Sequence, residues 1–274
     1  MPIDVKHYSD SLRQDDTGAW ISDASSDVSY PSSGHQSCFE LEPQSFWFNH
    51  RNRCIVDLVT NHPPDGPIFD IGGGNGFVTA ALAGAGFPTA LVEPGSVGVA
   101  NARARGVTTT IHTEAQAAGF RPASLPAIGM FDVLEHVEDD IGMLRWINTS
   151  LTPEGRLYLT VPAFDWLWSN EDDHAGHYRR YTKALLSERL AGTGFATEFV
   201  SYFFAPLVAP ILLVRTLPTR LGMRTDTTGD HAATEHTPPA AGLIGSLLDR
   251  EARRLAGGNS LPFGSSLLVA ARKR

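Results

Sequence analysis

The sequence predicts an α/β fold with a doubly wound, mostly parallel sheet, and three observations lead to this prediction. Short apolar runs alternate with helical patterns from residue 67 onward, in units of the length of a βα repeat. A glycine-rich turn, FDIGGGNG at residues 69–76, joins the first strand to the first helix. The 274 residues suffice for one sizeable α/β domain with an elaboration.

The elements follow one another along the core of the chain. Strands are expected at residues 67–71, 89–92, 107–111, 127–131, 156–161, 196–204 and 265–271. Helices are expected at residues 77–85, 96–105 and 133–147, and a further helix begins after Thr182. Alternating units of this kind place helices on both faces of a parallel sheet.

The two ends of the chain depart from this alternation. Residues 1–37 are polar and lack a sustained period, so we expect a loose arm, after which Phe46, Trp47 and Phe48 precede a helix. Before the last strand the chain contains a proline-broken apolar segment, a polar loop over 216–240 and another helix. We expect this insertion to be either disordered or a lid. The expected parts of this single domain are an arm or cap (1–55), a core (56–204), an insertion or lid (205–262) and a last strand (263–274).

Composition and charge exclude several classes of partner. The net charge of −8 and the pI near 5.6 leave no basic face for a nucleic acid. The two cysteines, Cys38 and Cys54, favour a reducing compartment over a disulfide framework. The longest apolar run, residues 203–214, contains Pro206 and Pro210 and is too short to span a bilayer. With no signal peptide pattern at the start, these features predict a cytoplasmic protein.

The glycine-rich turn restricts the kind of ligand. A phosphate-binding loop needs Gly-Lys-Ser/Thr after the glycines, but Phe77 follows Gly76. The dinucleotide pattern G-x-G-x-x-G, begun at Gly72, also fails at Phe77. Asp70 precedes the turn, and no lysine or arginine occurs between Arg53 and Arg103. An acid without a nearby cation favours a ligand with ammonium and sulfonium groups over a pyrophosphate.

Two further acidic positions follow strands of the same sheet. Glu93 stands at the exposed end of the second strand, seventeen residues after Gly76, where an acid can accept both hydroxyl hydrogens of a ribose. Phe131 and Asp132 stand at the carboxyl end of the fourth strand. Ligands of open α/β sheets bind at such ends.

Five motifs follow one another along the chain: FDIGGGNG, LVEP, FDVLEHVEDD, LTPEGRLYLTVP and FGSSLLVAARK. In this order and spacing, over roughly residues 45–274, the sequence resembles the class I S-adenosylmethionine-dependent methyltransferases, Rossmann-like proteins of the small-molecule type. The resemblance implies S-adenosylmethionine as cofactor and a seven-stranded sheet whose last strand is antiparallel. An acid commonly opens strand four in this family, whereas Leu125 and Pro126 stand there in this chain.

The resemblance also implies roles for individual residues. Asp70 with Gly72, Gly73, Gly74 and Gly76 would hold the methionine part of the cofactor, Glu93 the ribose and Glu114 the adenine amine, while Phe131 and Asp132 would flank the purine and the methionine. The reaction it implies is direct displacement, in which an oxygen, nitrogen or carbon nucleophile attacks the methyl carbon. The protein then supplies mainly alignment and desolvation.

A second dense stretch, WLWSNEDDHAGHYRRYTK at residues 166–183, allows three interpretations, and related methyltransferases carry a similar run. Its acids and histidines (Asp172, Asp173, His174 and His177) fit no zinc template, so no metal is expected. In a structural loop, Arg179 or Arg180 would pair with Asp172 or Asp173. In an acceptor loop, His177 would act as a general base, with His136 as the rival base.

The acceptor is expected to be a small molecule, as in secondary metabolism, and the oligomeric state is left open. Five aromatic residues are candidates for the wall of an acceptor pocket or for plain core: Trp47, Phe48, Trp166, Trp168 and Tyr181. If the arm closes over the acceptor, deleting residues 1–37 should preserve cofactor binding and lower methyl transfer. Two other functions compete, an NAD-dependent oxidoreductase on the same sheet and a non-catalytic cofactor-binding scaffold.

Overall fold

The computed structural model describes residues 2–23, 39–222 and 242–274. Its described strands are β1 (Arg13–Gln14), β2 (Trp20–Ile21), β3 (Ile68–Ile71), β4 (Thr89–Val92), β5 (Thr110–His112), β6 (Leu125–Phe131), β7 (Leu151–Pro162), β8 (Phe195–Phe203) and β9 (Ser266–Lys273). Its longer helices are α2 (Phe46–Asn61), α3 (Phe77–Gly84), α4 (Ser96–Ala104), α5 (Asp140–Ser150), α6 (Asn170–Ala175), α7 (Lys183–Gly192) and α11 (Leu243–Ala256).

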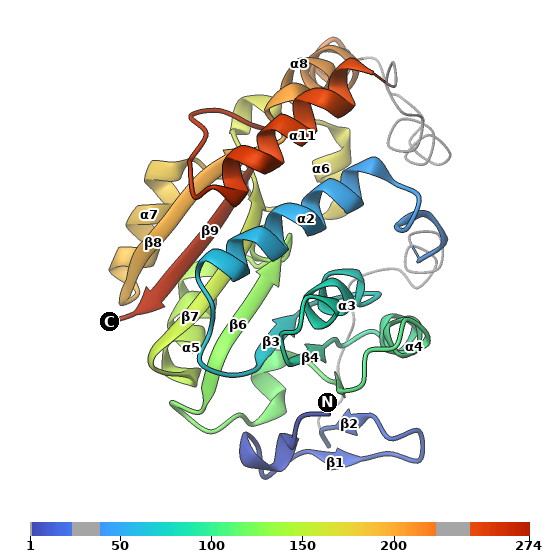
Figure 1. Ribbon diagram of the computed structural model, residues 1–274, viewed down its shortest axis with the longest axis vertical. Helices are drawn as coiled ribbons and strands as arrows, with labels where there is room; N and C mark the ends of the chain where they lie inside the picture. Colours follow the sequence, from blue (N-terminus) through green and yellow to red (C-terminus); the bar gives the residue numbers. More distant parts are fainter. Residues whose placement is uncertain (1, 24–38, 223–241) are drawn as a thin grey trace.

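All nine of these strands form one sheet in the order β1-β2-β5-β4-β3-β6-β7-β9-β8 (Figure 1). The strands from β5 to β7 in this order are parallel, and β9 lies antiparallel between β7 and β8. The α/β, doubly wound prediction is therefore confirmed, and the last strand is antiparallel as the family resemblance implies. The sheet has two more strands than the seven expected, because β1 and β2 extend its β5 edge.

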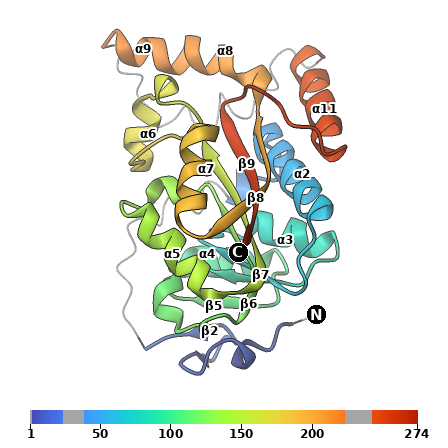
Figure 2. The same cartoon turned by 90° about the vertical axis from the view of Figure 1, so that its left-hand side faces the viewer.

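The core lies on both faces of the sheet, which explains why β3 and β4 are buried along their whole length. On one face, α5 and α7 pack through residues such as Leu144 and Leu186. On the other, α2, α3 and α11 pack through residues such as Ile55, Leu82 and Leu248 (Figure 2). Each helix contributes one apolar stripe to the sheet, as a doubly wound fold requires.

The expectation of a loose arm is wrong for residues 2–23. Val5 and Leu12 are fully buried, and the ring of Tyr8 packs edge-on against Phe69 with centroids 4.9 Å apart. Ser9 donates its hydroxyl hydrogen to the carbonyl of Ala118 over 2.7 Å. These apolar residues follow no period, because Val5 lies in a 3-10 turn, η1 (Val5–His7), and Leu12 lies just before the two-residue strand β1. Residues 24–37, the rest of the expected arm, and Cys38 lie outside the described residues.

Several element boundaries also differ from the predictions. Helix α2 begins at Phe46, since the hydroxyl of Ser45 caps it by accepting the N–H of Phe48, so the aromatic cluster forms its first turn. The single helix expected over 133–147 is a short 3-10 turn, η3 (Leu134–His136), followed by α5, which Asp139 caps. The fourth strand begins at Leu125.

After β8 the chain forms a nearly continuous helical segment over residues 205–220. It consists of η5 (Ala205–Leu207), α8 (Val208–Ile211), the π-helical η6 (Leu212–Thr216) and α9 (Leu217–Arg220). The predicted polar loop is therefore helical over residues 216–220, and its part over 223–240 lies outside the described residues. Among the helices that the structure describes, none has the length and apolar character needed to cross a membrane.

Helix α11 is joined to α2 and to the end of β8 by one buried acid. The carboxylate of Glu251 accepts the backbone N–H groups of Phe204 and Ala205 over 2.6 and 2.8 Å. Its Oε1 also lies 2.8 Å from Nε2 of His50 on α2. A single side chain thus connects three segments that are far apart in the sequence.

Candidate functional site

The predicted site residues gather at one edge of the sheet, because the parallel strands β3 to β7 all end there. The glycine turn follows β3, Glu93 follows β4, Glu114 follows β5 and Asp132 follows β6. The exits from β6, β7 and β8 share a left-handed backbone, with φ of +58° at Asp132, +62° at Phe164 and +60° at Phe204. Side chains from separate strands therefore meet along this edge, where ligands of α/β sheets bind.

The glycine turn has a physical reason for each of its glycines. Gly72, Gly74 and Gly76 have φ of +67°, +53° and +72°, a conformation that glycine adopts without a steric cost. At Gly73 a Cβ atom would lie 2.5 Å from Cδ1 of Leu91 and 2.8 Å from Oδ2 of Asp70. Gly72, Gly74 and Gly76 therefore give the turn its backbone conformation, and Gly73 allows Leu91 and Asp70 to pack closely against the turn.

Asp70 lies beneath this turn with an unused hydrogen-bonding atom. Its Oδ2 accepts the hydroxyl hydrogen of Thr79 over 2.5 Å, whereas its buried Oδ1 has no hydrogen-bond partner in the described structure. Burial raises the pKa of Asp70 to about 7, against the opposing effects of Thr79 and Arg51. A buried oxygen without a partner is costly unless a ligand supplies a donor.

Glu93 is buried rather than at an exposed strand end, which corrects the sequence expectation. Its Oε2 accepts the backbone N–H of Gly74 over 2.9 Å, and its Oε1 accepts that of Gly95 over 2.7 Å. The carboxylate therefore holds the glycine turn against the beginning of α4. The contact of Glu93 with the ribose stays a prediction. Glu114 is exposed, two residues beyond β5.

Arg51 is a site residue that the sequence analysis missed. From the middle of α2 it donates through Nη1 to Oδ2 of Asp132 over 2.5 Å, and it lies over the rings of Trp47 and Phe48 at 5.0 and 5.1 Å. The other oxygen of Asp132 accepts the hydroxyl hydrogen of Thr160. No local motif marks this arginine, because its partner lies on a strand end far along the chain.

The aromatic residues of α2 reach the same edge. Trp47 stacks on Phe204 with centroids 5.3 Å apart, and Phe48 contacts the ring of Phe77, the first residue of α3, at 6.3 Å. Asn52 donates to the carbonyl of Phe77 over 3.0 Å. Helix α2 thus packs against the beginning of α3, directly after the glycine turn. Phe131, at the end of β6, is 6% exposed and packs in the core beneath α2.

The loop over 166–183 is organised around Asp172, whose carboxylate is almost fully buried. Nδ1 of His177 lies 2.8 Å from its Oδ1, and Arg180 donates to Oδ1 and Oδ2 over 2.8 and 2.9 Å. Burial raises the pKa of Asp172, but the hydrogen bonds from His177 and Arg180 outweigh it and lower the pKa to about 2. Asp172 is therefore ionised near neutral pH.

His177 also contacts His136, the rival base, and Glu135. The two imidazole rings meet edge-on with centroids 4.7 Å apart. Burial, together with the nearby His177, lowers the pKa of His136 to about 4, so its imidazole is neutral near pH 7. One ligand atom each from Glu135, His136 and His177 lies within 4.8 Å of the others, a donor set that could hold a divalent cation.

The arginines of the loop bind different acids, as do two of its aromatic residues. Arg180 pairs with Asp172, as the structural interpretation expects, whereas Arg179 binds Asp140 at 3.3 Å. The prediction that Tyr181 lines the acceptor pocket is wrong, since it is fully buried and donates to Asp140 over 2.8 Å. Trp168 donates to Asp173 over 3.0 Å, and Trp166 is 38% exposed.

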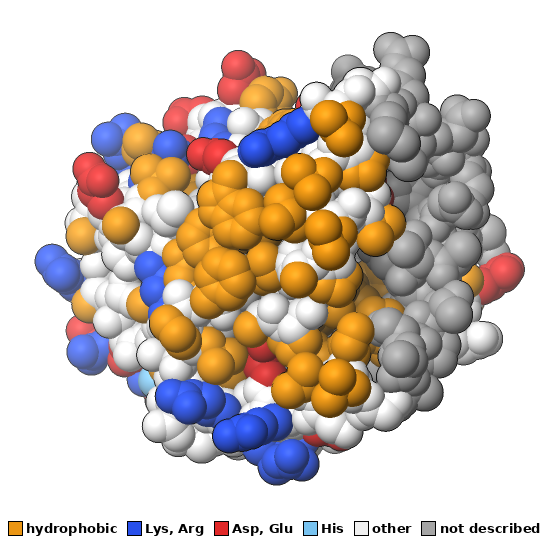
Figure 3. All heavy atoms as spheres, turned by 90° about the horizontal axis from the view of Figure 1, so that it is seen from above, with side chains coloured by type: hydrophobic (Ala, Val, Ile, Leu, Met, Phe, Trp, Pro, Cys, Tyr) orange, Lys and Arg blue, Asp and Glu red, His pale blue; other side chains and the backbone are white. Residues whose placement is uncertain are grey.

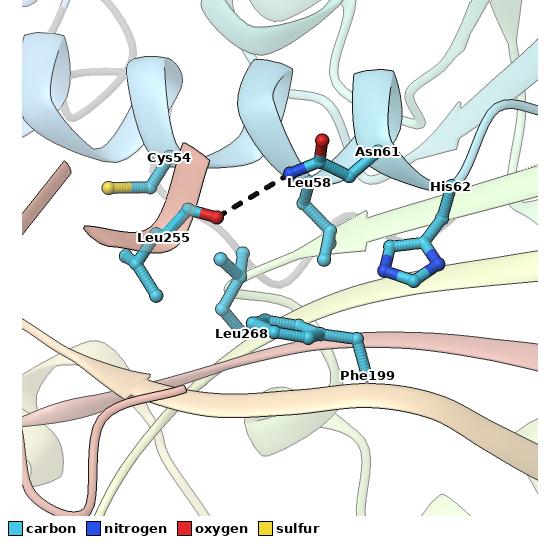
Figure 4. Close-up of a pocket in the computed structure, with 7 residues that line it drawn as sticks. All are labelled: Cys54, Leu58, Asn61, His62, Phe199, Leu255 and Leu268. Carbon is cyan, nitrogen blue, oxygen red and sulfur yellow. Dashed lines mark hydrogen bonds between the residues drawn. The ribbon is translucent and has the colours of Figure 1, made fainter. Parts of the chain in front are cut away.

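A small cavity lies away from this edge, between α2, α11, β8 and β9 (Figure 4). Its volume is about 10 Å³, and it is lined by Cys54, Leu58, Asn61, His62, Phe199, Leu255 and Leu268. Such a volume is at the lower limit for one water molecule. The cavity therefore belongs to the packing of α11 on α2 and cannot hold a cofactor.

Comparisons with known proteins agree with this geometry. A family model described as a methyltransferase domain matches residues 46–200, and no curated protein matches the sequence. Phosphoethanolamine N-methyltransferase 2 of Haemonchus contortus, solved with S-adenosyl-L-methionine, has 18% identity and a TM-score of 0.57, covering 90% of this chain and 58% of that one.

Two further solved structures share the fold. A methyltransferase in a Haloferax volcanii complex with the Trm112 activator has 14% identity and a TM-score of 0.53, covering 88% of this chain and 93% of that one. Geranyl diphosphate C-methyltransferase from Streptomyces coelicolor A3(2) has 14% identity and a TM-score of 0.50, covering 80% and 78%. Since the family model covers more than half of the sequence, this chain belongs to the methyltransferase domain family, as a class I S-adenosylmethionine-dependent methyltransferase.

Proposed function

We propose that the protein transfers a methyl group to an oxygen, nitrogen or carbon nucleophile of a small molecule, as in secondary metabolism, and that it does so in the cytoplasm. The observation that supports this proposal is the position of the His177–Asp172 pair, on the loop after β7, beside the strand ends that carry the glycine turn. A potential base thus lies on the same edge as the cofactor residues.

The residues of the glycine turn fit S-adenosylmethionine. Among the residues that the structure describes, none donates a hydrogen bond to the buried Oδ1 of Asp70, and Gly72 and Gly74 of the turn are half-buried with left-handed backbone conformations. We assign Asp70 and the turn to the methionine part, Glu93 to the ribose and Glu114 to the adenine amine. Arg51 supplies a cation for the amino acid carboxylate. When bound, the cofactor supplies an electrophilic methyl group on a positively charged sulfur.

His177 has the arrangement of a general base. Its Nδ1–H donates to the ionised Asp172, which leaves Nε2 as the proton acceptor. The carboxylate fixes the orientation of the ring and stabilises the imidazolium that forms after proton transfer. Arg180 holds Asp172 in place from its other side. An acceptor that is already anionic would need only the alignment.

The same histidines could instead hold a cation together with Glu135. A metal role and a base role predict opposite responses to a chelator. If His177 is a base, dialysis of the protein against EDTA leaves turnover unchanged. If turnover is lost and returns with Mg²⁺ or Mn²⁺, the three residues are ligands and His177 is not the base.

The proposed function is tested in two steps. Thermal-shift measurements should show stabilisation by S-adenosylhomocysteine and none by NAD, whereas the reverse would support the oxidoreductase. Radiolabelled S-adenosylmethionine should then transfer its label to a component of a fractionated small-molecule pool. Cofactor binding without transfer to any fraction supports the scaffold. If the label appears in a protein fraction instead, the acceptor is a macromolecule and not a small molecule.

A further inference from the structure

The exposed large apolar side chains of the described structure are concentrated at one end of the molecule. Of ten such residues, eight lie on η4 (Asp165–Leu167), on the helical segment after β8, on the first half of α11 and on the loop before β9. These eight residues, which we call the apolar face, are Trp166, Leu213, Val214, Leu217, Leu221, Leu243, Leu247 and Phe263. Figure 3 shows hydrophobic side chains gathered over this end.

Direct contacts join the segments that carry the apolar face. Trp166 and Phe263 stack with ring centroids 6.2 Å apart, and Arg220 donates to the carbonyl of Trp166 over 3.0 Å. Thr216 donates to the carbonyl of Leu167 over 3.0 Å. The loop of the candidate site and the segment over 205–220 therefore form one surface, and α11 lies at the same end of the molecule (Figures 1 and 2).

The helical segment presents its apolar stripe outward. Leu213, Val214, Leu217 and Leu221 recur at the spacing of one helix face, and their exposed fractions are 62%, 52%, 39% and 74%. Thr216, a polar residue of the same segment, is fully buried. An amphipathic helix in water normally buries its apolar stripe. A contiguous exposed apolar surface of this kind marks an interaction site.

The charge of these segments indicates the chemistry of the partner. Residues 165–167, 205–222 and 242–263, which carry the apolar face, contain five arginines and three acids, in a chain whose net charge is −8. One of the three acids, Glu251, is buried and bound to backbone N–H groups, while Arg250 and Arg254 on α11 are exposed. Exposed leucines with a tryptophan and neighbouring arginines are the composition of helices that lie in an anionic membrane interface.

We propose that the apolar face docks this protein on the surface of an anionic lipid bilayer. The headgroup region receives the exposed leucines of the apolar face, Leu213, Leu217, Leu221, Leu243 and Leu247. Trp166 lies at the interface. Arg250 and Arg254 contact lipid phosphates. The protein lies on the bilayer rather than across it. Because Trp166 belongs to the same loop as His177, docking brings that loop to the membrane.

The test is co-sedimentation of the full chain with sucrose-loaded vesicles. Vesicles of phosphatidylcholine with about one third phosphatidylglycerol should pellet the protein at low salt, and pure phosphatidylcholine should pellet it less. The double variant Leu213→Glu/Leu217→Glu should bind at least about tenfold more weakly, because two charges would enter the apolar region. Arg250→Glu/Arg254→Glu should remove the preference for anionic vesicles.

Ile141→Glu is the matched control, since Ile141 is 39% exposed on α5 and lies outside the apolar face. It should pellet like the unchanged protein. Leu221→Glu, at the exposed end of the helical segment, replaces the double variant if that variant melts at a lower temperature. The proposal is overturned if the unchanged protein stays in the supernatant of anionic vesicles. It is also overturned if Leu213→Glu/Leu217→Glu pellets normally, or if that variant turns a dimer into a monomer in sedimentation equilibrium.

Discussion

His177 and Asp172 form a hydrogen-bonded pair, with Nδ1 of the imidazole 2.8 Å from Oδ1 of the carboxylate. They are five residues apart, joined across the end of α6, and Arg180 binds both oxygens of the same carboxylate. The pair therefore combines a structural ion pair with an oriented imidazole. The structural interpretation of this loop concerns the ion pair of Asp172 with Arg180, and the catalytic interpretation concerns Nε2 of His177. Both are compatible with the same arrangement of side chains.

Replacing His177 by alanine should lower turnover by about 10²- to 10⁴-fold for an acceptor that must lose a proton. The dissociation constant of the cofactor should stay unchanged, because His177 lies on the loop after β7 and not on the glycine turn. Steady-state kinetics and calorimetry measure the two quantities. His174→Ala, in the same loop, is the control and should keep its turnover. If His177→Ala changes neither quantity, His136 becomes the base to test.

Glu93→Ala should weaken cofactor binding ten- to a hundredfold, which corresponds to roughly 1.5–3 kcal/mol for a lost charge-assisted contact. It should also lower the melting temperature, because the N–H groups of Gly74 and Gly95 lose their acceptor. Glu114→Ala, at an exposed position, should change affinity less and stability not at all. Calorimetry that shows unchanged affinity for Glu93→Ala would remove this residue from the site.

Cofactor affinity should increase with pH through the region near 7. The folded protein holds a proton on Asp70, whose pKa is raised to about 7, and a cationic ligand prefers the ionised carboxylate. The stability of the free protein should change in the opposite direction. Asp70 contributes stability below pH 4 that is lost as pH rises through 7. Calorimetry of Asp70→Asn should show weaker binding without this pH dependence, and a parallel pH dependence would contradict the assignment.

Two glycine-to-alanine substitutions should have opposite effects on stability. In Gly73→Ala the new Cβ would meet Leu91 and Asp70, so the free energy of unfolding should fall by about 1–3 kcal/mol. In Gly84→Ala, at the end of α3, the Cβ would meet nothing within 4 Å, and the helix should gain about 0.4–1 kcal/mol. Urea denaturation of both variants measures the difference. Equal effects would mean that the turn relaxes around Gly73.

Deleting residues 1–23 should lower stability as well as activity, which replaces the expectation that cofactor binding survives without the arm. The deletion removes the fully buried Val5 and Leu12 and exposes the edge of β5. Leu12→Ala alone should cost about 2–5 kcal/mol of unfolding free energy. Arg13→Ala breaks only an exposed ion pair with Asp23 and should cost less than about 1 kcal/mol. A truncated protein with the full melting temperature would contradict this role.

The sequence predicted the parts of the fold that repeat locally. The βα alternation and the turn before α3 are properties of short segments, so each could be recognised on its own. The two strands of residues 13–21 could not, because two residues carry no period. Arg51 and Tyr181 show the same limit at the site. Their partners, Asp132 and Asp140, are distant in the chain, and only the folded sheet brings them together.

The left-handed residues that follow β6, β7 and β8 have a cost. A left-handed backbone strains a residue with a Cβ by roughly 1–2 kcal/mol, and Phe164 and Phe204 have no short polar side chain to offset this locally. Domains of this kind are stable by only about 5–15 kcal/mol in total. Backbone strain is therefore concentrated at the ends of the strands that carry the site, and it lowers the free energy of unfolding. The packed core beneath α2 and α5 must offset this destabilisation.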